Sequence, residues 1–373
     1  MWIRALRLTD FRNYERLELE LEEGLNFFAG ANGSGKTSIL EAVSYLAVAR
    51  SLRGASDAEV VRWARPGFGV GGDIVADGTV RSSTLRFTRG GKKEVTLDGE
   101  KQTLLSDLVG VLRVAWFCPE DTWLTKGGPS ERRKLLDMTL CQLDPSYLDA
   151  LSNYRRALRQ RNEALLSWTP DEESEALVGV WSEQLVHYGS RVTLGRMRLL
   201  PQLAEAVAGF HENISGSGAL RLRYRSTTEG VTESGEDPPT EDEIRSSFSD
   251  SLERVAADER RRGFTLVGPH RDDLEVRLGD RALRTFGSQG QHRTAAIALK
   301  LGQAAVLDSD GRGVVVLLDD IMSELDDQRA ASLLELVGGL GQALMTSTRG
   351  APALGAARRS RSFVVEAGEV KRR

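Results

Sequence analysis

The sequence predicts an α/β protein in which both ends of the chain assemble one lobe and a mainly helical lobe is inserted between them. Three observations predict this fold: a strand, glycine-rich turn and helix near residue 30, helical periodicity through the middle of the chain, and a strand apolar on both faces near residue 316. The 373 residues suffice for two lobes with separate cores. We place the first lobe at residues 1–118 plus 306–373 and the inserted lobe at 119–305.

Strands and one helix are expected in the first hundred residues. Apolar residues alternate with polar ones around a turn at residues 10–13, namely Ile3, Leu6, Leu8, Leu17, Leu19 and Leu21. Residues 25–29 predict a short buried strand. Residues 37–49 predict a helix, because Ile39, Leu40, Val43 and Leu46 share one face. Glycine turn pairs at 77–78, 90–91 and 98–99 predict hairpins over residues 69–100.

The middle of the chain changes to helical patterns. Asp144-Pro145 is typical of a helix start, and the apolar residues that follow at helical spacing predict a short antiparallel helical pair: Leu151, Tyr154, Leu158, Leu165, Trp181, Leu185, Tyr188 and Val192. Residues 229–243 hold seven acidic residues and no basic one, which predicts a solvated loop. Residues 314–318 predict a buried parallel strand, and the basic residues from 358 to 373 are interpreted as a frayed tail.

Composition limits the classes of function. Net charge is −4, so nucleic acid could be bound only through local basic patches, although arginine supplies 42 of the 50 basic residues. The two cysteines, Cys118 and Cys141, form no CxxC pattern, which fits a reducing cytoplasm better than a disulfide framework. Neither a signal peptide nor a run of 18 apolar residues is found. We therefore expect a cytoplasmic protein with no membrane partner.

The segment between the predicted strand and helix near residue 30 matches the pattern G-x-x-x-x-G-K-[ST]. It comprises Gly30, Ala31, Asn32, Gly33, Ser34, Gly35, Lys36 and Thr37. Glycines let the backbone N–H groups converge on phosphate oxygens, and the helix N-terminus adds partial positive charge. We expect Lys36 to reach the β- and γ-phosphates of ATP and Thr37 to provide an oxygen to Mg²⁺.

A pair of acids follows the predicted strand at 314–318. Carboxylates at the carboxyl end of a parallel strand lie where ligands bind in open α/β sheets. We therefore assign Asp319 to the Mg²⁺ shell and Asp320 to orienting or deprotonating the attacking water. The alternative is an ordinary helix N-cap or turn acid.

A third candidate site lies at Ser288, Gly290 and Gln291, before a helical run from His292 to Val306. Together with Gly287, they place a serine and two glycines at a helix start, which could form a second phosphate-facing surface. A plain loop ending in a serine cap explains the same residues.

The order of these motifs resembles the ABC-ATPase set, with the Ser-x-Gly-Gln element as the signature motif in the inserted lobe and residues 323–326 similar to the D-loop. Lys36 and Ser288 are 288 − 36 = 252 residues apart, a spacing intermediate between transporter domains and chromosome-organising heads and similar to that of the RecF family. Further stretches resemble that family: residues 10–14, 117–121, 129–133 and 268–274. His292, where a glutamine is more usual, departs from its pattern.

The resemblance implies a P-loop NTPase of the ABC-ATPase head type. It further implies a homodimer closed around two ATP molecules, with each phosphate loop facing the partner's Ser288. DNA, both duplex and gapped, and the proteins RecR and RecO are implied as partners in recombinational repair. The rival hypothesis is the nucleotide-binding subunit of a membrane transporter. Motif spacing disfavours it, as does Thr346-Ser347-Thr348 where transporters have a histidine. An inactive structural head is disfavoured by the intact Lys36 and paired acids.

Arginine clusters at 155–161, 191–198 and 260–262 are candidate DNA contacts, and the sequence does not choose among them. His270, beside Arg271 and two acids, is interpreted as a structural hydrogen-bonding group rather than a catalyst.

Overall fold

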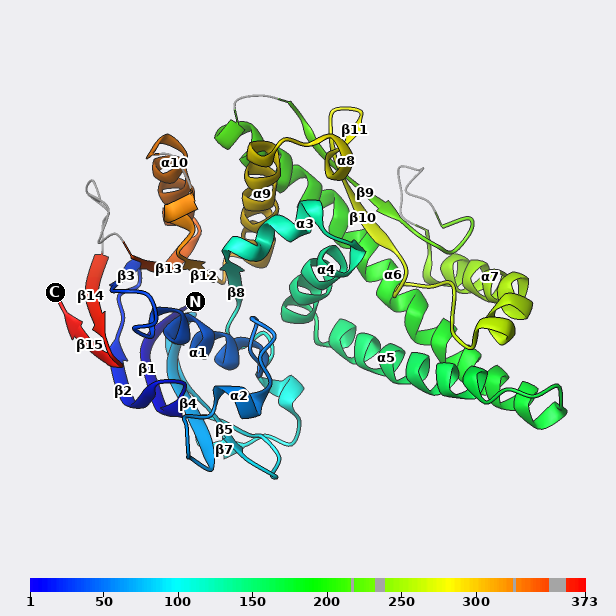
Figure 1. The fold of residues 1–373 in the computed structure, drawn as a ribbon, viewed down its shortest axis with the longest axis horizontal. Coiled ribbons are helices and arrows are strands. Elements are labelled where there is room, and N and C mark those ends of the chain that lie inside the picture. Colours follow the sequence, from blue (N-terminus) through cyan, green and yellow to red (C-terminus); the bar gives the residue numbers. More distant parts are fainter. Residues whose placement is uncertain (216–217, 232–238, 325–326, 349–359) are drawn as a thin grey trace. The chain divides into compact units, whose positions relative to one another are not determined.

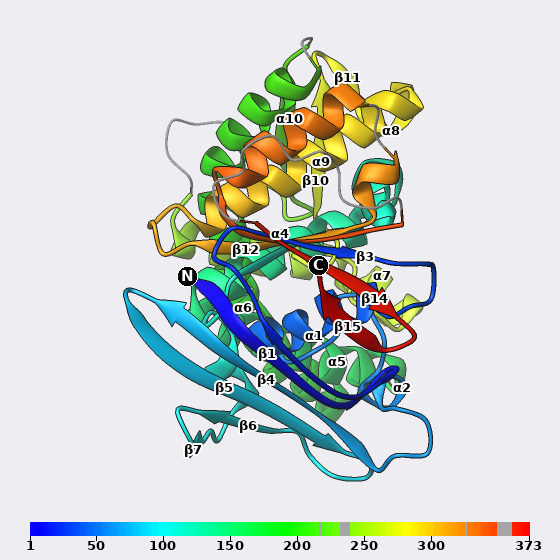
Figure 2. The ribbon, with the colours of Figure 1, turned by 90° about the vertical axis from the view of Figure 1, so that its left-hand side faces the viewer.

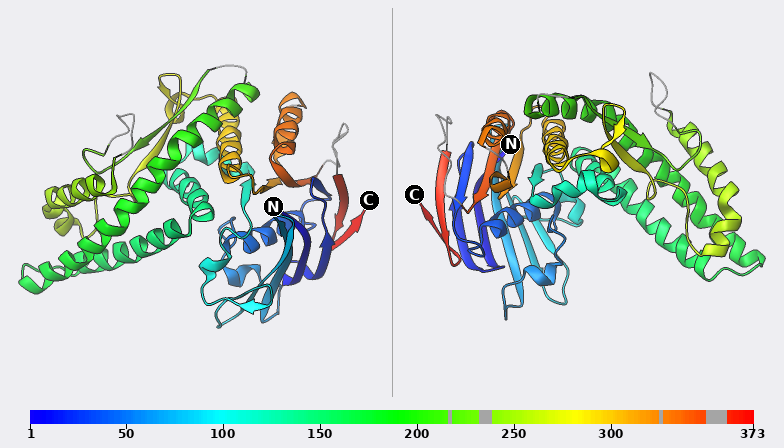
Figure 3. Two further views of the ribbon diagram at one scale, coloured as in Figure 1. Left: turned by 180° about the vertical axis from the view of Figure 1, so that it is seen from behind. Right: turned by 45° about the horizontal axis from the view of Figure 1, so that its top comes forward.

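The computed structural model describes residues 1–215, 218–231, 239–324, 327–348 and 360–373. Figure 1 labels its helices and strands, and Figure 3 gives two further views. Contacts within the chain define two compact units. Unit 1 comprises Met1–Thr122, Gly209–Gly216 and Ala296–Arg373, and unit 2 comprises Trp123–Ala208 and Ser217–Ala295.

Unit 1 contains two sheets of six strands. The first is antiparallel, in the order β2 (Tyr14–Glu20), β1 (Trp2–Phe11), β4 (Gly67–Ala76), β5 (Thr79–Thr88), β6 (Glu94–Leu97) and β7 (Glu100–Lys101). The second has the order β15 (Glu369–Arg372), β14 (Ser360–Glu366), β3 (Leu25–Ala29), β13 (Gly341–Ser347), β12 (Val314–Asp319) and β8 (Val114–Phe117). All its pairings are parallel except that of β14 with β15, and the sheet contains strands from both ends of the chain.

Helix α1 (Lys36–Val48) packs against strands of both sheets, as Figure 2 shows. Its residues from Ile39 to Val48 are buried, which confirms the predicted helix but not an amphipathic one. Tyr45 meets Phe11 and Phe68 edge to face, with ring centroids 5.7 and 5.1 Å apart. The helix is therefore enclosed by apolar contacts along most of its length.

A buried glutamine joins the two sheets. Gln342 on β13 accepts from Ile3 N at 2.8 Å and donates to Ile3 O at 2.8 Å, so it pairs with β1 much as a neighbouring strand would. It also donates to Glu22 O at 2.7 Å. Each buried polar atom of this side chain has a partner, which offsets the cost of burying the amide.

The chain end is ordered, so the prediction of a frayed tail from residue 358 is wrong for residues 360–373. Strand β14 pairs with β3, and Phe363 stacks on Phe28 with ring centroids 4.9 Å apart. Val365 is fully buried. Arg361 on the same strand is also largely buried, because it donates to Glu20 O at 2.7 Å and pairs with the Glu22 carboxylate.

The remaining elements of unit 1 are helical. They are α2 (Asp57–Val60), η1 (Leu105–Leu108), η2 (Pro119–Thr122), η3 (Ile321–Glu324), α10 (Asp327–Gly338), the end of α6 (Glu172–Ser215) and the second half of α9 (Gln289–Leu307), which is largely buried. Cys118 is partly buried and Cys141 is buried, and neither forms a disulfide bond among the described residues.

Unit 2 is mainly helical. Its helices are α3 (Trp123–Lys126), α4 (Pro129–Leu143), α5 (Pro145–Leu166), α6 (Glu172–Ser215) up to Ala208, α7 (Glu241–Arg262), α8 (Leu283–Phe286) and the start of α9. A three-stranded sheet, β11 (Arg281–Ala282), β10 (Asp273–Leu278) and β9 (Leu220–Arg225), lies among them. Helices α5 and α6 form the predicted antiparallel pair (Figures 1 and 3). Helix α6 spans 44 residues, so it is longer than expected, and it continues through Pro201.

Part of the segment predicted to be an acidic loop is helical. Thr240 accepts from Glu243 N at 3.3 Å, while the Glu243 carboxylate accepts from Thr240 N at 2.8 Å. This capping box starts α7, and acids in its first turn interact favourably with the helix dipole. The loop prediction is therefore wrong for residues 241–243, and residues 232–238 lie outside the described part of the chain.

Buried ion pairs hold the helices of unit 2 together. Arg161 on α5 donates to Glu259 on α7 at 2.7 Å, and their side chains are 3% and 0% exposed. Arg196 on α6 makes a similar pair with Asp137 on α4 at 2.8 Å. Two of the arginines considered as DNA contacts are thus occupied inside the unit.

His270 also has a structural place. Its Nδ1 lies 2.6 Å from Tyr154 Oη and its Nε2 lies 3.3 Å from Thr265 O. Burial lowers the pKa of the imidazole to about 4, so the ring is neutral at pH 7. These contacts agree with the interpretation of His270 as a hydrogen-bonding group.

Replacing Glu259 by alanine should destabilise unit 2, because Arg161 would stay buried without its carboxylate. Losing one partner of such a pair costs about 3–5 kcal/mol. Urea unfolding followed by tryptophan fluorescence should show a clearly lower midpoint. Asp258→Ala is the matched control, since it removes a pair with Arg261 in which both side chains are at least half exposed. Equal midpoints for the two variants would contradict the assignment.

Candidate nucleotide site

The glycine-rich segment forms a tight loop between β3 and α1. Gly33 and Gly35 have φ angles of 77° and 115°, which side chains rarely adopt. A Cβ atom on Gly30 would lie 2.2 Å from Val365 O, and one on Gly35 would lie 2.5 Å from Asn13 Nδ2. The loop therefore requires glycine both for its backbone conformation and for close approach of its neighbours.

Neighbouring segments hold the loop through its carbonyl oxygens. Asn13 Nδ2 donates to Ser34 O at 3.0 Å, and Tyr14 Oη donates to Gly35 O at 3.1 Å. Asn13 and Tyr14 belong to the stretch at residues 10–14 that resembles the RecF family. The physical role of this stretch is therefore to hold the phosphate loop in place through hydrogen bonds from the β1–β2 turn.

The side chain of Lys36 lies against the phosphate loop. Its Nζ donates to Gly30 O and Ala31 O, at 2.8 Å each, and the residue is 6% exposed. Burial lowers the pKa of the ammonium, while the charges of Asp320 and Asp319 act in the opposite direction. An ammonium group is thus held beside the loop, at the place where phosphate oxygens would enter.

The paired acids meet the loop at the end of β12. Asp319 Oδ1 accepts from Thr37 Oγ1 at 2.8 Å and from Thr346 Oγ1 at 2.9 Å. Burial raises the pKa of the Asp319 carboxyl, and the two hydroxyl hydrogen bonds oppose that rise. Asp320 has a left-handed φ of 51° and donates its backbone N–H to Thr346 Oγ1 at 3.0 Å. Thr346 therefore contacts both acids, a role not expected from its sequence.

These residues surround a cavity of about 580 Å³ within unit 1. The cavity is lined by Arg12, Asn13, Asn32, Gly33, Gly35, Lys36, Thr37, Ser38, Arg53, Glu59, Val61, Asp319, Asp320, Thr346 and Thr348. The volume suits a small-molecule ligand. Ser34 Oγ in the loop is buried and has no hydrogen-bond partner among the described residues, so it could bond to a ligand in the cavity.

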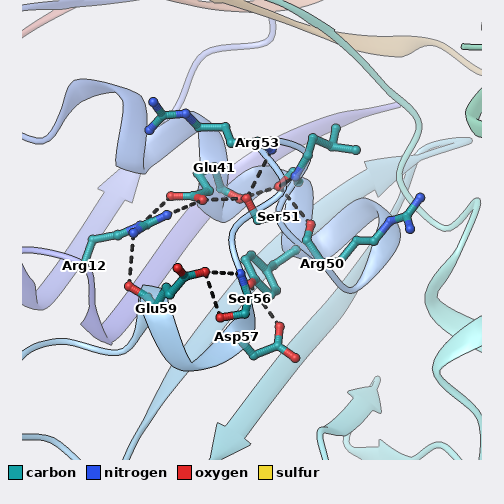
Figure 4. A network of polar contacts seen from close by, with 11 residues as sticks. Arg12, Glu41, Arg50, Ser51, Arg53, Ser56, Asp57 and Glu59 are labelled. Atoms are coloured by element: carbon teal, nitrogen blue, oxygen red, sulfur yellow. Dashed lines mark hydrogen bonds and ion pairs between the residues drawn. The ribbon is translucent and has the colours of Figure 1, made fainter. Parts of the chain in front are cut away.

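Beyond the loop, a buried carboxylate on α1 organises one wall of the cavity (Figure 4). Glu41 is fully buried and accepts from Arg12 Nε and Nη2, at 2.7 Å each. Ser51 Oγ donates to the same carboxylate at 2.6 Å and accepts from Arg53 N at 3.1 Å. One carboxylate thus fixes two segments that bring arginines to the cavity.

Two further bonds extend this network. Arg12 Nη1 donates to Glu59 O at 3.1 Å, and Ser44 Oγ donates to Arg50 O at 3.1 Å. Sequence reasoning missed Glu41, although an acid four residues after Thr37, on a helix otherwise apolar in that region, was a signal.

The candidate signature residues, Ser288, Gly290 and Gln291, belong to unit 2. Ser288 Oγ accepts from Gln291 N at 3.3 Å, and the Gln291 side chain accepts from Ser288 N at 2.8 Å. Ser288, Gly290 and Gln291 are all exposed at the start of α9. Ser288 therefore caps the helix, as the alternative interpretation expected. The phosphate-binding role of these residues remains a prediction. Nearby, His292 is buried, with Nδ1 3.0 Å from Thr125 Oγ1.

Other expected features fall partly outside the described residues. The D-loop-like element includes residues 325–326, which are not described, while its first residues lie at the end of η3. Among the described residues, no group of three or more His, Cys, Asp or Glu side chains could hold a metal ion by itself. Thr37 with Asp319 instead offers two oxygens, which suits Mg²⁺ bound jointly with phosphates. No described helix is both long and apolar enough to cross a membrane.

The sequence is similar to those of known proteins over nearly its whole length. A family model described as the RecF/RecN/SMC N terminal domain matches residues 2–370. The DNA replication and repair protein RecF of Acidothermus cellulolyticus is 39% identical over 373 residues, 99% of each chain. Its namesake from an Exiguobacterium species is 36% identical over 350 residues, 93% of this chain and 92% of its own.

Solved structures of known proteins are also similar to this chain. Two structures of the recombination mediator protein RecF in the RecFOR pathway, one with ATPrS and one with ATP, have TM-scores of 0.91 and 0.90. Each is 30% identical and covers all of this chain, which spans 98% and 97% of theirs. An Smc head bound to the C-winged helix domain of ScpA shares the fold, with a TM-score of 0.57 at 17% identity. The expected fold class, an ABC-ATPase head, is confirmed.

Replacing Glu41 by glutamine should weaken ATP binding, because the Arg12 guanidinium and the Ser51–Arg53 segment would lose their shared charge. We expect the Kd for ATP, measured by calorimetry, to rise about tenfold, equivalent to about 1.4 kcal/mol. Thermal unfolding reports on the fold, and Ser51→Ala, which removes one of the three bonds, should have a smaller effect. An unchanged Kd for Glu41→Gln would show that the buried carboxylate does not organise the cavity.

Proposed function

The chain belongs to the RecF family, and on that premise we propose that it is an ATP-hydrolysing, DNA-binding protein of recombinational repair. The observation that supports this best is the cavity in which the glycine loop, Lys36, Thr37, Asp319 and Asp320 converge. Relatives at 36–39% identity are named DNA replication and repair proteins. Family membership leaves the alternative of a transporter subunit without support.

The residues divide the nucleotide chemistry among them. The backbone N–H groups of the loop and the N-terminus of α1 bind phosphate oxygens, and Lys36 exchanges its two carbonyl partners for the β- and γ-phosphates. Thr37 and Asp319 would hold Mg²⁺, which when bound would supply positive charge to the phosphate oxygens. Asp320, whose backbone N–H is fixed by Thr346, orients the attacking water or accepts its proton.

Two subunits complete each catalytic site in this proposal. The exposed Ser288, Gly290 and Gln291 at the start of a 19-residue helix offer N–H groups and a hydroxyl to the γ-phosphate bound by the partner. ATP binding then closes the dimer on duplex or gapped DNA, and hydrolysis opens it. RecR and RecO are the proposed partners, since similar structures are described within the RecFOR pathway.

DNA binding should depend on ATP and on salt. Fluorescence anisotropy with a labelled duplex should show tighter binding with ATP than without it, and affinity should fall steeply as salt rises because the contacts are to phosphates. Two unrelated sequences should bind alike. Lys36→Ala, which removes the phosphate-binding ammonium, should abolish the ATP effect while its circular dichroism stays native. Strong sequence preference or a flat salt response would refute the proposal.

Complementation between variants tests the composite site. Ser288→Arg should block the partner's γ-phosphate while sparing its own ATP binding, and Lys36→Ala should do the reverse. A mixed dimer then has one doubly defective site and one intact site. Random pairing of equal amounts makes about half the dimers mixed, so ATPase activity should recover to at most about a quarter of wild type. If mixed dimers form and no activity above the single variants returns, the trans arrangement is wrong.

A further inference from the structure

Strand β9 presents a row of arginines on one face of the small sheet in unit 2. Its sequence alternates apolar or aromatic residues with Arg221, Arg223 and Arg225, and all three arginines are exposed. The register pairs them with Arg277, Glu275 and Asp273 on β10. Since residues directly opposite share a face, every side chain on this face of the two strands is charged.

The opposite face of the same strands is apolar and packed. Leu220 and Tyr224 on β9 are 2% and 5% exposed, and Leu274 and Val276 on β10 are 0% and 6% exposed. Tyr224 Oη further donates to the buried Asp272 at 2.7 Å. Because the side chains of a strand alternate between faces, this anchoring fixes the direction in which the arginines point.

The acids on the charged face do not neutralise it. Asp273 is occupied by the buried Arg132, with two bonds of 2.8 and 2.9 Å. Glu275 is shared between Arg277 at 3.0 Å and Arg225 at 3.5 Å. Arg223 makes no ion pair within the described part of the chain, and Arg221 has only a 3.7 Å contact with the exposed Asp280. Exposed pairs of this kind are weak and exchange readily for another anion.

The arginine clusters that the sequence offered differ from this face. Arg161 and Arg196 are buried against Glu259 and Asp137. On the surface, Arg155, Arg191, Arg260 and Arg261 each lie within 3.3 Å of a carboxylate. Arg156, Arg159, Arg198 and Arg262 are exposed, but they are divided among the three helices α5, α6 and α7.

We propose that the outward face of β9 and β10, with Arg221, Arg223, Arg225 and Arg277, binds the phosphate backbone of duplex DNA; we call it the arginine face. This rests on the proposed DNA-binding function and gives it a location. Alternate residues of a strand stand about 6.6 Å apart, so successive guanidinium groups can engage different phosphates, with bidentate geometry. The face lacks the apolar centre that a protein partner would require. Its contacts position the duplex without reading sequence.

The test compares two triple variants of the full chain that remove the same charge from unit 2. One is Arg221→Ser, Arg223→Ser and Arg225→Ser, and the matched control is Arg156→Ser, Arg159→Ser and Arg262→Ser. Affinity for a labelled duplex is measured with ATP across a salt titration, and ATP binding and thermal unfolding confirm that each variant is folded. The β9 variant should bind the duplex at least tenfold more weakly. Its salt slope should fall by about one for each phosphate that its side chains no longer neutralise.

The outcomes separate the surface from the function. If wild type and control bind duplex DNA while the β9 variant shows reduced affinity and a shallower slope, the arginine face is supported. If all three bind alike, or the two variants are weakened equally, the face is not the DNA site, although the DNA-binding function stands. A β9 variant that binds DNA normally but no longer binds an acidic protein partner would reassign the face to that partner. Failure of the wild type to bind duplex DNA would overturn both proposals.

Discussion

The hydrogen bond from Thr37 Oγ1 to Asp319 Oδ1, 2.8 Å long, joins residues 282 positions apart in the chain. It forms because β3 and β12 both pair with β13 in the parallel sheet, which brings the phosphate loop and the paired acids to the same edge. Thr346, at the carboxyl end of β13 between them, adds a second hydroxyl to Asp319. The nucleotide cavity therefore exists only when both ends of the chain are folded together, whatever lies between them.

Buried charge sets the remaining geometry of both units. Glu41 in unit 1 and Glu259 in unit 2 are fully buried, and each accepts hydrogen bonds from an arginine and further donors. Such pairs gain little stability relative to apolar packing, but they are costly to break and tolerate few alternative arrangements. In unit 1 the result is a cavity wall with arginines held in place. In unit 2 it is a helical frame on which the small sheet rests.

Charge is distributed unevenly on a chain that is acidic overall. Several surface arginines of the helices, among them Arg191, Arg245, Arg260 and Arg261, are matched by carboxylates one helical turn away or on a neighbouring helix. The outward face of β9 and β10 differs because strand alternation gathers four arginines on one side with only two acids, one of which is engaged by the buried Arg132. A net charge of −4 is therefore compatible with a local site for a polyanion.

Local sequence determined those elements whose formation depends mainly on residues close by in the chain. The glycine loop before α1, the strand at 314–319 and the cap at Asp144 follow from backbone and capping chemistry that acts over a few residues. The order of the motifs also determined the fold class. Tertiary structure decided the rest, because burial and pairing depend on residues far apart. Basic residues near 360 became strand β14 by pairing with β3, two surface-like arginines became buried partners of Glu259 and Asp137, and Glu41 became the centre of a cavity wall.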